Sequence, residues 1–272
     1  TELFLAVGIG VLAGGFAGAR LLGKISPAAA TLVFAAVMLA LVLLVQATGA
    51  YALFTGGTVR KLPIYSVERE DKKVAISFDC AWGTDHTDAI LDALAKANVR
   101  ATFFMVEFWA EKYPEYVKKI DEAGHEIGTH SSTHSYMSKL SEADIRRELQ
   151  TSSEAITAIT GKPVEVFRAP FGDYDDLLIE TAKDMGLYTI QWDVDSLDWK
   201  DLSASEITLR IVGKAKSGSI ILCHNNGLHT AEALPAVLAT LQNSGYEFVP
   251  AGELIYRDHF TVDANGRQHS AS

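Results

Sequence analysis

The sequence predicts an α/β fold in which a parallel sheet closes into a barrel of about seven β/α units. Strand-like and helix-like segments alternate about seven times along residues 72–257, a pattern that produces parallel strands with right-handed crossovers. Residues 60–272 also have the length of one α/β barrel domain. Several of the strand-like segments end in polar residues, as is typical of barrels that gather their reactive groups at the carboxyl ends of their strands.

Two apolar segments precede this domain. Residues 3–22 and 27–54 are each long enough to supply the roughly 20 residues that span a bilayer. Arg20 and Lys24 lie between them, and the positive-inside rule places that basic link in the cytoplasm. The sequence therefore predicts an integral membrane protein whose α/β domain lies outside the cytoplasm. A reporter enzyme fused after Tyr256 should then be active only in an extracytoplasmic location.

The membrane segments set the first predicted boundaries. We assign residues 1–24 to a first transmembrane helix with its basic link and residues 25–56 to a second one. A cleaved signal peptide is the alternative for the first segment, although its basic residues follow the apolar run instead of preceding it. Arg60 and Lys61 follow the second segment and favour the opposite orientation.

The charge of the remaining chain excludes one class of partner. The full chain carries a formal net charge of −10. Residues 60–272 hold 22 Lys and Arg residues against 33 Asp and Glu residues, with no basic cluster. This balance argues against a nucleic-acid partner.

The predicted elements follow one another in a regular order. We expect a polar linker at 57–71, the α/β domain at 72–257 and a polar, frayed tail at 258–272. The predicted strands are residues 73–79, 101–106, 126–129, 164–167, 187–192, 219–222 and 246–249. The predicted helices are residues 84–97, 114–123, 141–160, 175–185, 203–215, 231–243 and 251–256.

Two histidines four residues apart are the first candidate metal ligands. His130 and His134 enclose only serines and a threonine. On a helical turn such residues share one face, and two neutral imidazoles there can bind one ion at about 2.0–2.1 Å. The spacing by itself is weak, since two unrelated histidines in a solvated turn would look the same.

Five short motifs in order add weight to this pair. They are Ser77-Phe78-Asp79, His130 to His134, Arg168-Ala169-Pro170-Phe171-Gly172, Asp195-Ser196-Leu197-Asp198-Trp199 and Leu222-Cys223-His224. Together they resemble the polysaccharide deacetylases, the NodB-homology carbohydrate esterases, over about residues 72–254. The segment Phe-Asp-Cys-Ala-Trp-Gly is similar to a sporulation-associated branch of that family. The resemblance implies a distorted (β/α)7 barrel and metal-dependent removal of N-acetyl or O-acetyl groups from a glycan.

The resemblance also implies a role for each motif residue. His130 and His134 would hold a divalent ion, with zinc expected, and Asp79 would be the general base. Arg168 would keep Asp79 ionised. His224 would protonate the leaving amine.

Further residues would complete the site. Asp198 would keep His224 charged and oriented. The backbone N–H of Phe171 would help to hold the oxyanion. Trp199 and Leu222 would form the wall of the acetyl pocket, while Asp195 would either bind substrate or only cap its loop.

One position departs from the family pattern. Most members carry a second Asp after the first, and that Asp binds the metal, whereas this chain has Cys80. Three interpretations remain open: a Cys80 thiolate binds zinc, Asp85 supplies the carboxylate, or two histidines and water hold the ion. A disulfide between Cys80 and Cys223 also remains open.

The leading hypothesis is a membrane-anchored, metal-dependent hydrolase that deacetylates a cell-envelope glycan, with peptidoglycan favoured. The alternatives are a deacetylase of chitin-like or acetyl-xylan glycans and a glycan-binding relative without catalytic activity. Two membrane helices favour a substrate near the membrane. Retention of Asp79, Arg168, Asp198 and His224 argues against loss of activity.

Overall fold

The computed structural model describes residues 60–271. The predicted transmembrane helices at 1–24 and 25–56 lie outside these residues, as does the start of the predicted linker. Between residues 60 and 271, no helix is both long enough and apolar enough to cross a bilayer.

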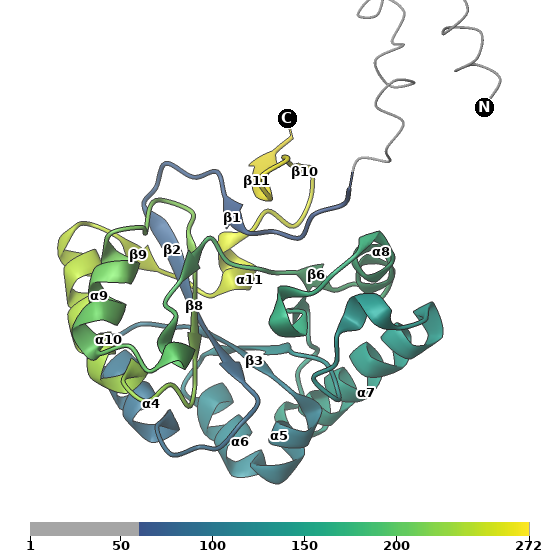
Figure 1. Ribbon diagram of the computed structural model, residues 1–272, viewed down its shortest axis with the longest axis horizontal. Coiled ribbons are helices and arrows are strands. Elements are labelled where there is room, and N and C mark those ends of the chain that lie inside the picture. The colour runs from purple at the N-terminus through teal and green to yellow at the C-terminus, as the bar shows by residue number, and fades with distance from the viewer. Residues whose placement is uncertain (1–59, 272) are drawn as a thin grey trace, which may run out of the picture. The chain divides into compact units, whose positions relative to one another are not determined.

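An eight-stranded parallel sheet forms the centre of the domain (Figure 1). Its strands are β2 (Lys73–Cys80), β3 (Thr102–Met105), β4 (Glu126–Thr129), β5 (Val166–Phe167), β6 (Tyr188–Thr189), β7 (Val194–Asp195), β8 (Ile220–His224) and β9 (Glu247–Phe248). The order is β6-β5-β4-β3-β2-β8-β7, and β9 pairs with the start of β2. The predicted α/β class with parallel strands is confirmed. The sheet curls into a half-barrel, and no ladder within residues 60–271 joins β6 to β7.

The incoming chain occupies the gap between these two edges. Ile64 forms a parallel bridge with Ile190, and Ser66 forms an antiparallel bridge with Ser219. The predicted strand 187–192 therefore ends early, because the amide of Gln191 bonds to the carbonyl of Ile64 instead of continuing the ladder. The closed barrel expected from the alternation of strands and helices is interrupted at this point.

Helices surround the convex side of the sheet (Figure 1). They are α4 (Thr87–Lys96), α5 (Glu107–Lys112), α6 (Pro114–Glu122), α7 (Glu142–Thr160), α8 (Asp176–Asp184), α9 (Ala204–Val212) and α10 (Thr230–Asn243), with the short α11 (Ala251–Leu254) near the start of β2. The hydroxyl of Ser141 caps α7 by accepting from the amide of Asp144, and Gly161 ends that helix at φ 70°. Two expectations were wrong: α4 begins at Thr87 instead of 84, and α5 was not predicted.

The two faces of β2 explain where its side chains lie. Successive side chains of a strand point to opposite faces of the sheet. Ile76, Phe78 and Cys80 pack in the large core between the sheet and the helices. Ala75 packs in the smaller core on the concave side. Asp79 lies on the same side of the strand and lines a cleft there. This alternation separates Asp79 from its neighbour Cys80.

A second sheet involves both ends of the described chain. It contains β1 (Ser66–Val67), β10 (Phe260–Val262) and β11 (Arg267–Ser270), in the order β1-β11-β10. The predicted linker therefore contains a strand, and the tail predicted to be frayed is a hairpin whose last strand pairs with β1. A reporter that tests membrane topology belongs after this hairpin and not after Tyr256.

Candidate active site

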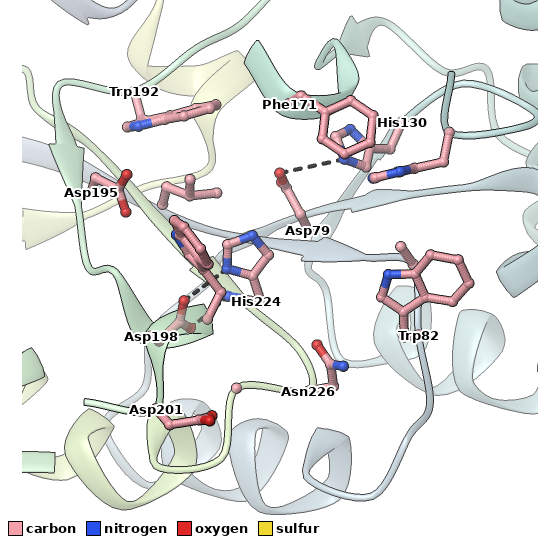
Figure 2. A pocket seen from close by; sticks show the side chains of 15 residues that line it. Asp79, Trp82, His130, Phe171, Trp192, Asp195, Asp198, Asp201, His224 and Asn226 are labelled. Carbon is pink, nitrogen blue, oxygen red and sulfur yellow. Dashed lines mark hydrogen bonds and ion pairs between the residues drawn. The ribbon is translucent and has the colours of Figure 1, made fainter. Parts of the chain in front are cut away.

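A cleft of about 670 Å³ lies where the carboxyl ends of the strands meet (Figure 2). Parallel strands present their carboxyl ends at one edge, so residues far apart in sequence converge there. The cleft is lined by Asp79, Ala81, Trp82, His130, His134, Phe171, Trp192, Asp195, Asp198, Trp199, Asp201, Leu222, His224, Asn226 and Gly227.

Asp79 and Arg168 form a buried ion pair. Nη1 of Arg168 donates to Oδ1 of Asp79 at 2.8 Å, and the Arg168 side chain is fully buried. The guanidinium also donates to the carbonyl of Gln191 and lies over the ring of Phe104 at 4.1 Å. Burial alone would raise the pKa of Asp79, but Arg168, His130 and His224 together outweigh it, and the pKa is lowered. Asp79 is therefore ionised at neutral pH.

His130 lies on the other side of the Asp79 carboxylate. Its Nδ1 is 2.8 Å from the carbonyl oxygen of Arg168, so Nδ1 carries the proton and donates. Its Nε2 is then left with a lone pair, 3.5 Å from Oδ2 of Asp79. Burial lowers the pKa of His130, which keeps the imidazole neutral and able to bind a metal.

The loop that carries the two histidines is not helical, contrary to the prediction. Ser131 and His134 adopt left-handed backbone angles, with φ of 72° and 57°. The amide of His134 donates to the hydroxyl of Ser131 at 3.0 Å, which folds the loop back on itself. The two imidazole rings nevertheless lie 5.1 Å apart between their centroids. Burial lowers the pKa of His134 to about 4, with a further contribution from His130.

Asp198 and His224 form a second pair on the opposite side of the cleft (Figure 2). Nδ1 of His224 donates to Oδ1 of Asp198 at 2.7 Å. Oδ2 of Asp198 accepts from the backbone amide of His224 and from the hydroxyl of Thr230. Burial opposes charge on both groups, but the pair outweighs it: the pKa of Asp198 is lowered and that of His224 is raised. His224 is therefore the side chain suited to donate a proton.

Comparison with known proteins identifies relatives of this chain. Residues 66–190 match the polysaccharide deacetylase family. A peptidoglycan-N-acetylglucosamine deacetylase of Bacillus cereus is 33% identical over 200 residues, which cover 72% of this chain and 93% of the relative. The chain belongs to the polysaccharide deacetylase family.

Other members of the family differ in length and in activity. The uncharacterized protein YlxY of Bacillus subtilis is 33% identical over 193 residues, and the match spans 71% of this chain but only 60% of that protein. A solved structure from Bacillus anthracis, described as a pseudoenzyme of carbohydrate esterase family 4, has a TM-score of 0.69 and 34% identity, covering 76% of this chain and 72% of that one. Membership in the family therefore does not by itself establish turnover.

The predicted substrate-binding residues all line the cleft. Phe171 has a left-handed backbone (φ 60°), stacks on Tyr136 at 4.3 Å and packs edge-on against His134. Trp199 is 57% exposed, and Leu222 is buried at the cleft wall. Asp195 caps its own loop by accepting from the amide of Leu197. It also reaches the cleft, so neither alternative for Asp195 excludes the other.

The two residues considered as third metal ligands lie elsewhere. Cys80 is fully buried in the core behind the sheet, with its Sγ directed to the carbonyl of Phe78. Burial raises the pKa of this thiol well above its usual range, which disfavours the thiolate that zinc requires. Asp85 is exposed and does not line the cleft. Cys80 and Cys223 are both free thiols, so the possible disulfide is not formed.

The donor set for a metal is therefore incomplete. Across residues 60–271, no three His, Cys, Asp or Glu side chains are grouped so as to hold an ion together. His130 and His134 do fit the chemistry, since both imidazoles are neutral and His130 has a free Nε2. The structure thus supplies two suitable nitrogen donors, and neither Cys80 nor Asp85 supplies a third.

Sequence reasoning missed several residues of the site. The loop after β8 contributes Asn226 and Gly227, and Asp201 comes from the loop after β7. Trp82 and Trp192 also line the cleft. The clearest overlooked signal was the run of polar residues directly after His224, because a loop at the carboxyl end of a strand is where a barrel builds its site.

Proposed function

We propose that this chain hydrolyses acetyl groups from a cell-envelope polysaccharide, with N-acetylated peptidoglycan as the favoured substrate. The observation that carries the proposal is the pair of oppositely biased groups at one cleft. Arg168 favours the ionised form of Asp79, and Asp198 favours the protonated form of His224. A general base biased toward its ionised form and a general acid biased toward its protonated form are what amide hydrolysis requires.

Each group then has a defined step. Oδ2 of Asp79 takes the proton of the attacking water as its oxygen bonds to the acetyl carbon. Nδ1 of His224 is occupied by Asp198, so Nε2 is the nitrogen that delivers a proton to the departing amine as the carbon–nitrogen bond breaks. The products are acetate and a free amino sugar. This is the chemistry of a hydrolase that acts on carbon–nitrogen bonds other than peptide bonds.

His130 and His134 are the residues that would hold a divalent metal ion, with zinc proposed because both donors are imidazole nitrogens. Such an ion would supply Lewis acidity that polarises the acetyl carbonyl and favours ionisation of water. The chain's own contribution is to keep both rings neutral and to fix His130 through its bond to the Arg168 carbonyl.

The cleft walls support a sugar substrate. Trp82 and Trp199 line the cleft with 59% and 57% of their surfaces exposed, and large exposed aromatic surface at a concave site is typical of ligand contact. Leu222 offers a small apolar surface for the acetyl methyl group. Relatives named as peptidoglycan deacetylases favour peptidoglycan over chitin-like or acetyl-xylan glycans.

A second candidate function is glycan binding without turnover. Two observations favour it. Cys80 occupies the sequence position at which most of the family has a metal-binding Asp, and its side chain faces the core. A relative is also described as a pseudoenzyme. The intact acid and base favour the first candidate.

Acetate release decides between them. Purified full-length protein would be incubated with acetylated peptidoglycan, and acetate would be measured with and without added zinc. We expect zinc-stimulated release and a loss of about 10²–10⁴-fold in Asp79→Asn, because the general base is removed. Glycan binding without any acetate release, at every metal tested, would establish the second candidate instead.

A further inference from the structure

The carboxylate of Glu148 reaches from the middle of α7 into the histidine loop. Its Oε2 accepts from the backbone amides of Ser132 at 2.9 Å and of Thr133 at 2.8 Å. Its Oε1 accepts from the Thr133 hydroxyl at 2.8 Å. The two amides belong to the residues between His130 and His134. Glu148 therefore binds the loop at its centre.

This carboxylate is buried without a cation. Only 7% of Glu148 is exposed, and it forms no salt bridge with any residue in 60–271. A buried charge is costly unless other groups compensate it. Here the compensation comes from the three donors of the loop, and hydrogen bonds to an ionised acceptor are stronger than neutral ones. The cost of burying Glu148 is offset only while the loop keeps this conformation.

The loop needs such support because its backbone is strained. Ser131 and His134 both have positive φ, and a left-handed residue other than glycine costs about 1–3 kcal/mol. The residues bonded to Glu148 lie directly between these two positions. Without those bonds, the loop could relax to ordinary backbone angles and the His134 ring would move.

A second residue of α7 supports the same loop. Ser152 lies four positions after Glu148 and so on the same face of the helix. Its hydroxyl pairs with that of Thr129, at the end of β4, and the Thr129 hydroxyl also accepts from the amide of Ser131. One face of α7 therefore contacts both the start and the middle of the loop.

We propose that Glu148 is a positioning residue that holds the 130–134 loop so that the two imidazoles can bind one metal ion. The metal part of this inference rests on the proposed function, whereas the positioning of the loop does not. Glu148 touches neither the cleft nor a reacting group. It acts through the backbone that carries His134.

The test uses three variants of the full chain, Glu148→Ala, Glu148→Gln and Glu154→Ala. Glu154 is the matched control, because it is an exposed carboxylate on the same helix whose one side-chain hydrogen bond within residues 60–271 comes from Gln150. Amide hydrogen exchange at Ser132 and Thr133 reports the loop. Calorimetric titration with zinc alone reports the histidine pair.

Glu148→Ala should speed exchange at both amides and weaken zinc binding by about 10–100-fold, the usual effect of losing a group that orients a metal ligand. Glu148→Gln should recover much of both, since its amide oxygen can still accept from the two backbone amides and its Nε2 can donate to the Thr133 hydroxyl. Glu154→Ala should match the wild type.

A Glu148→Ala protein with native far-UV circular dichroism, wild-type exchange and wild-type zinc affinity would overturn the proposal. Should Glu148→Ala not fold, Thr133→Val takes its place: it removes one of the three bonds, and unchanged exchange and affinity there would overturn the proposal equally. A wild-type chain that binds no zinc would contradict the metal site in the proposed function, while the exchange measurement would still decide whether Glu148 positions the loop.

Discussion

The two halves of the cleft hold their charges in different ways. On one side, Asp79 pairs with Arg168, whose side chain is fully buried and whose guanidinium does not lose its proton in proteins. On the other side, fully buried Asp198 pairs with His224, whose side chain is 26% exposed and can change its charge near neutral pH. One half is thus electrostatically fixed, and the other can exchange a proton with the substrate.

In each half, a charged partner stabilises the form of one side chain that catalysis needs. Arg168 serves the base, because its permanent charge keeps Asp79 ready to accept a proton. Asp198 serves the acid, because its three hydrogen bonds are satisfied and its charge favours the protonated His224. Removing the supporting residue should therefore damage the fixed half mainly in stability and the exchanging half mainly in pH dependence.

The largest expected effect follows from breaking the fixed half. Arg168→Met leaves the Asp79 carboxyl group buried without its cation, which should lower the free energy of unfolding by about 3–5 kcal/mol. Urea denaturation measures this, with Arg146→Met as the control. Arg146 pairs with Glu142 on the surface and should cost no more than about 1 kcal/mol. Similar losses in the two variants would contradict a special role for the buried pair.

A smaller effect is expected from the exchanging half. Asp198→Asn should lower the pKa of His224, because the hydrogen bond and charge that raise it are weakened. His224 must be protonated to act as acid, so the alkaline limb of the pH profile of acetate release should move to lower pH. The same pKa shift makes the free energy of unfolding depend on pH. Since the pKa of His224 is raised in the folded state, the stabilisation from its protonation is complete below the unfolded pKa and is lost as pH rises through the folded pKa. An unmoved alkaline limb in Asp198→Asn would exclude His224 as the acid.

The smallest effect is expected at Cys80, which faces neither half. Cys80→Ala removes one buried sulfur from the core, at a cost of about 0.5–1.5 kcal/mol by analogy with a small deletion of buried apolar atoms. Zinc affinity, measured by calorimetry, should stay at the wild-type value. A large loss of zinc in this variant would show that the thiol turns toward the histidines when the ion is bound.

Much of the site could be predicted because the short motifs contain the residues that the parallel strands bring together. Asp79, Arg168 and His224 are separated by more than 50 residues along the chain, yet the rule that strands share a carboxyl edge brings them together: Asp79 and His224 line one cleft, and Arg168 pairs with Asp79. The direction of Cys80 was harder to predict. The regular pairing of β2 with β3 continues through Cys80, and this pairing decides which face of the sheet the Cys80 side chain lies on. A shift of one residue in the pairing would place that side chain on the opposite face.

The parts that sequence reasoning missed depend on contacts between distant segments. The histidine loop is held by Glu148, which belongs to the next helix and carries no motif of its own. The open edge of the sheet depends on Ile64, which comes from a segment that looked like a linker. Neither contact leaves a periodic signal, because each involves single residues whose partners are set only by the packed fold.

The pairing of β1 with β11 also has a consequence for how the protein is made. Ser66 lies beside Arg267, so β1 finds its partner only after the residues up to β11 have been synthesised. Contacts between such distant positions require a large loop to close and slow the approach to the native state. On the ribosome, the helices and most of the parallel sheet can form as the chain emerges, while Ser66 and Val67 wait with an unpaired edge. The domain should therefore complete its folding only after β11 has emerged, and a chain that lacks β11 should keep β1 without its partner.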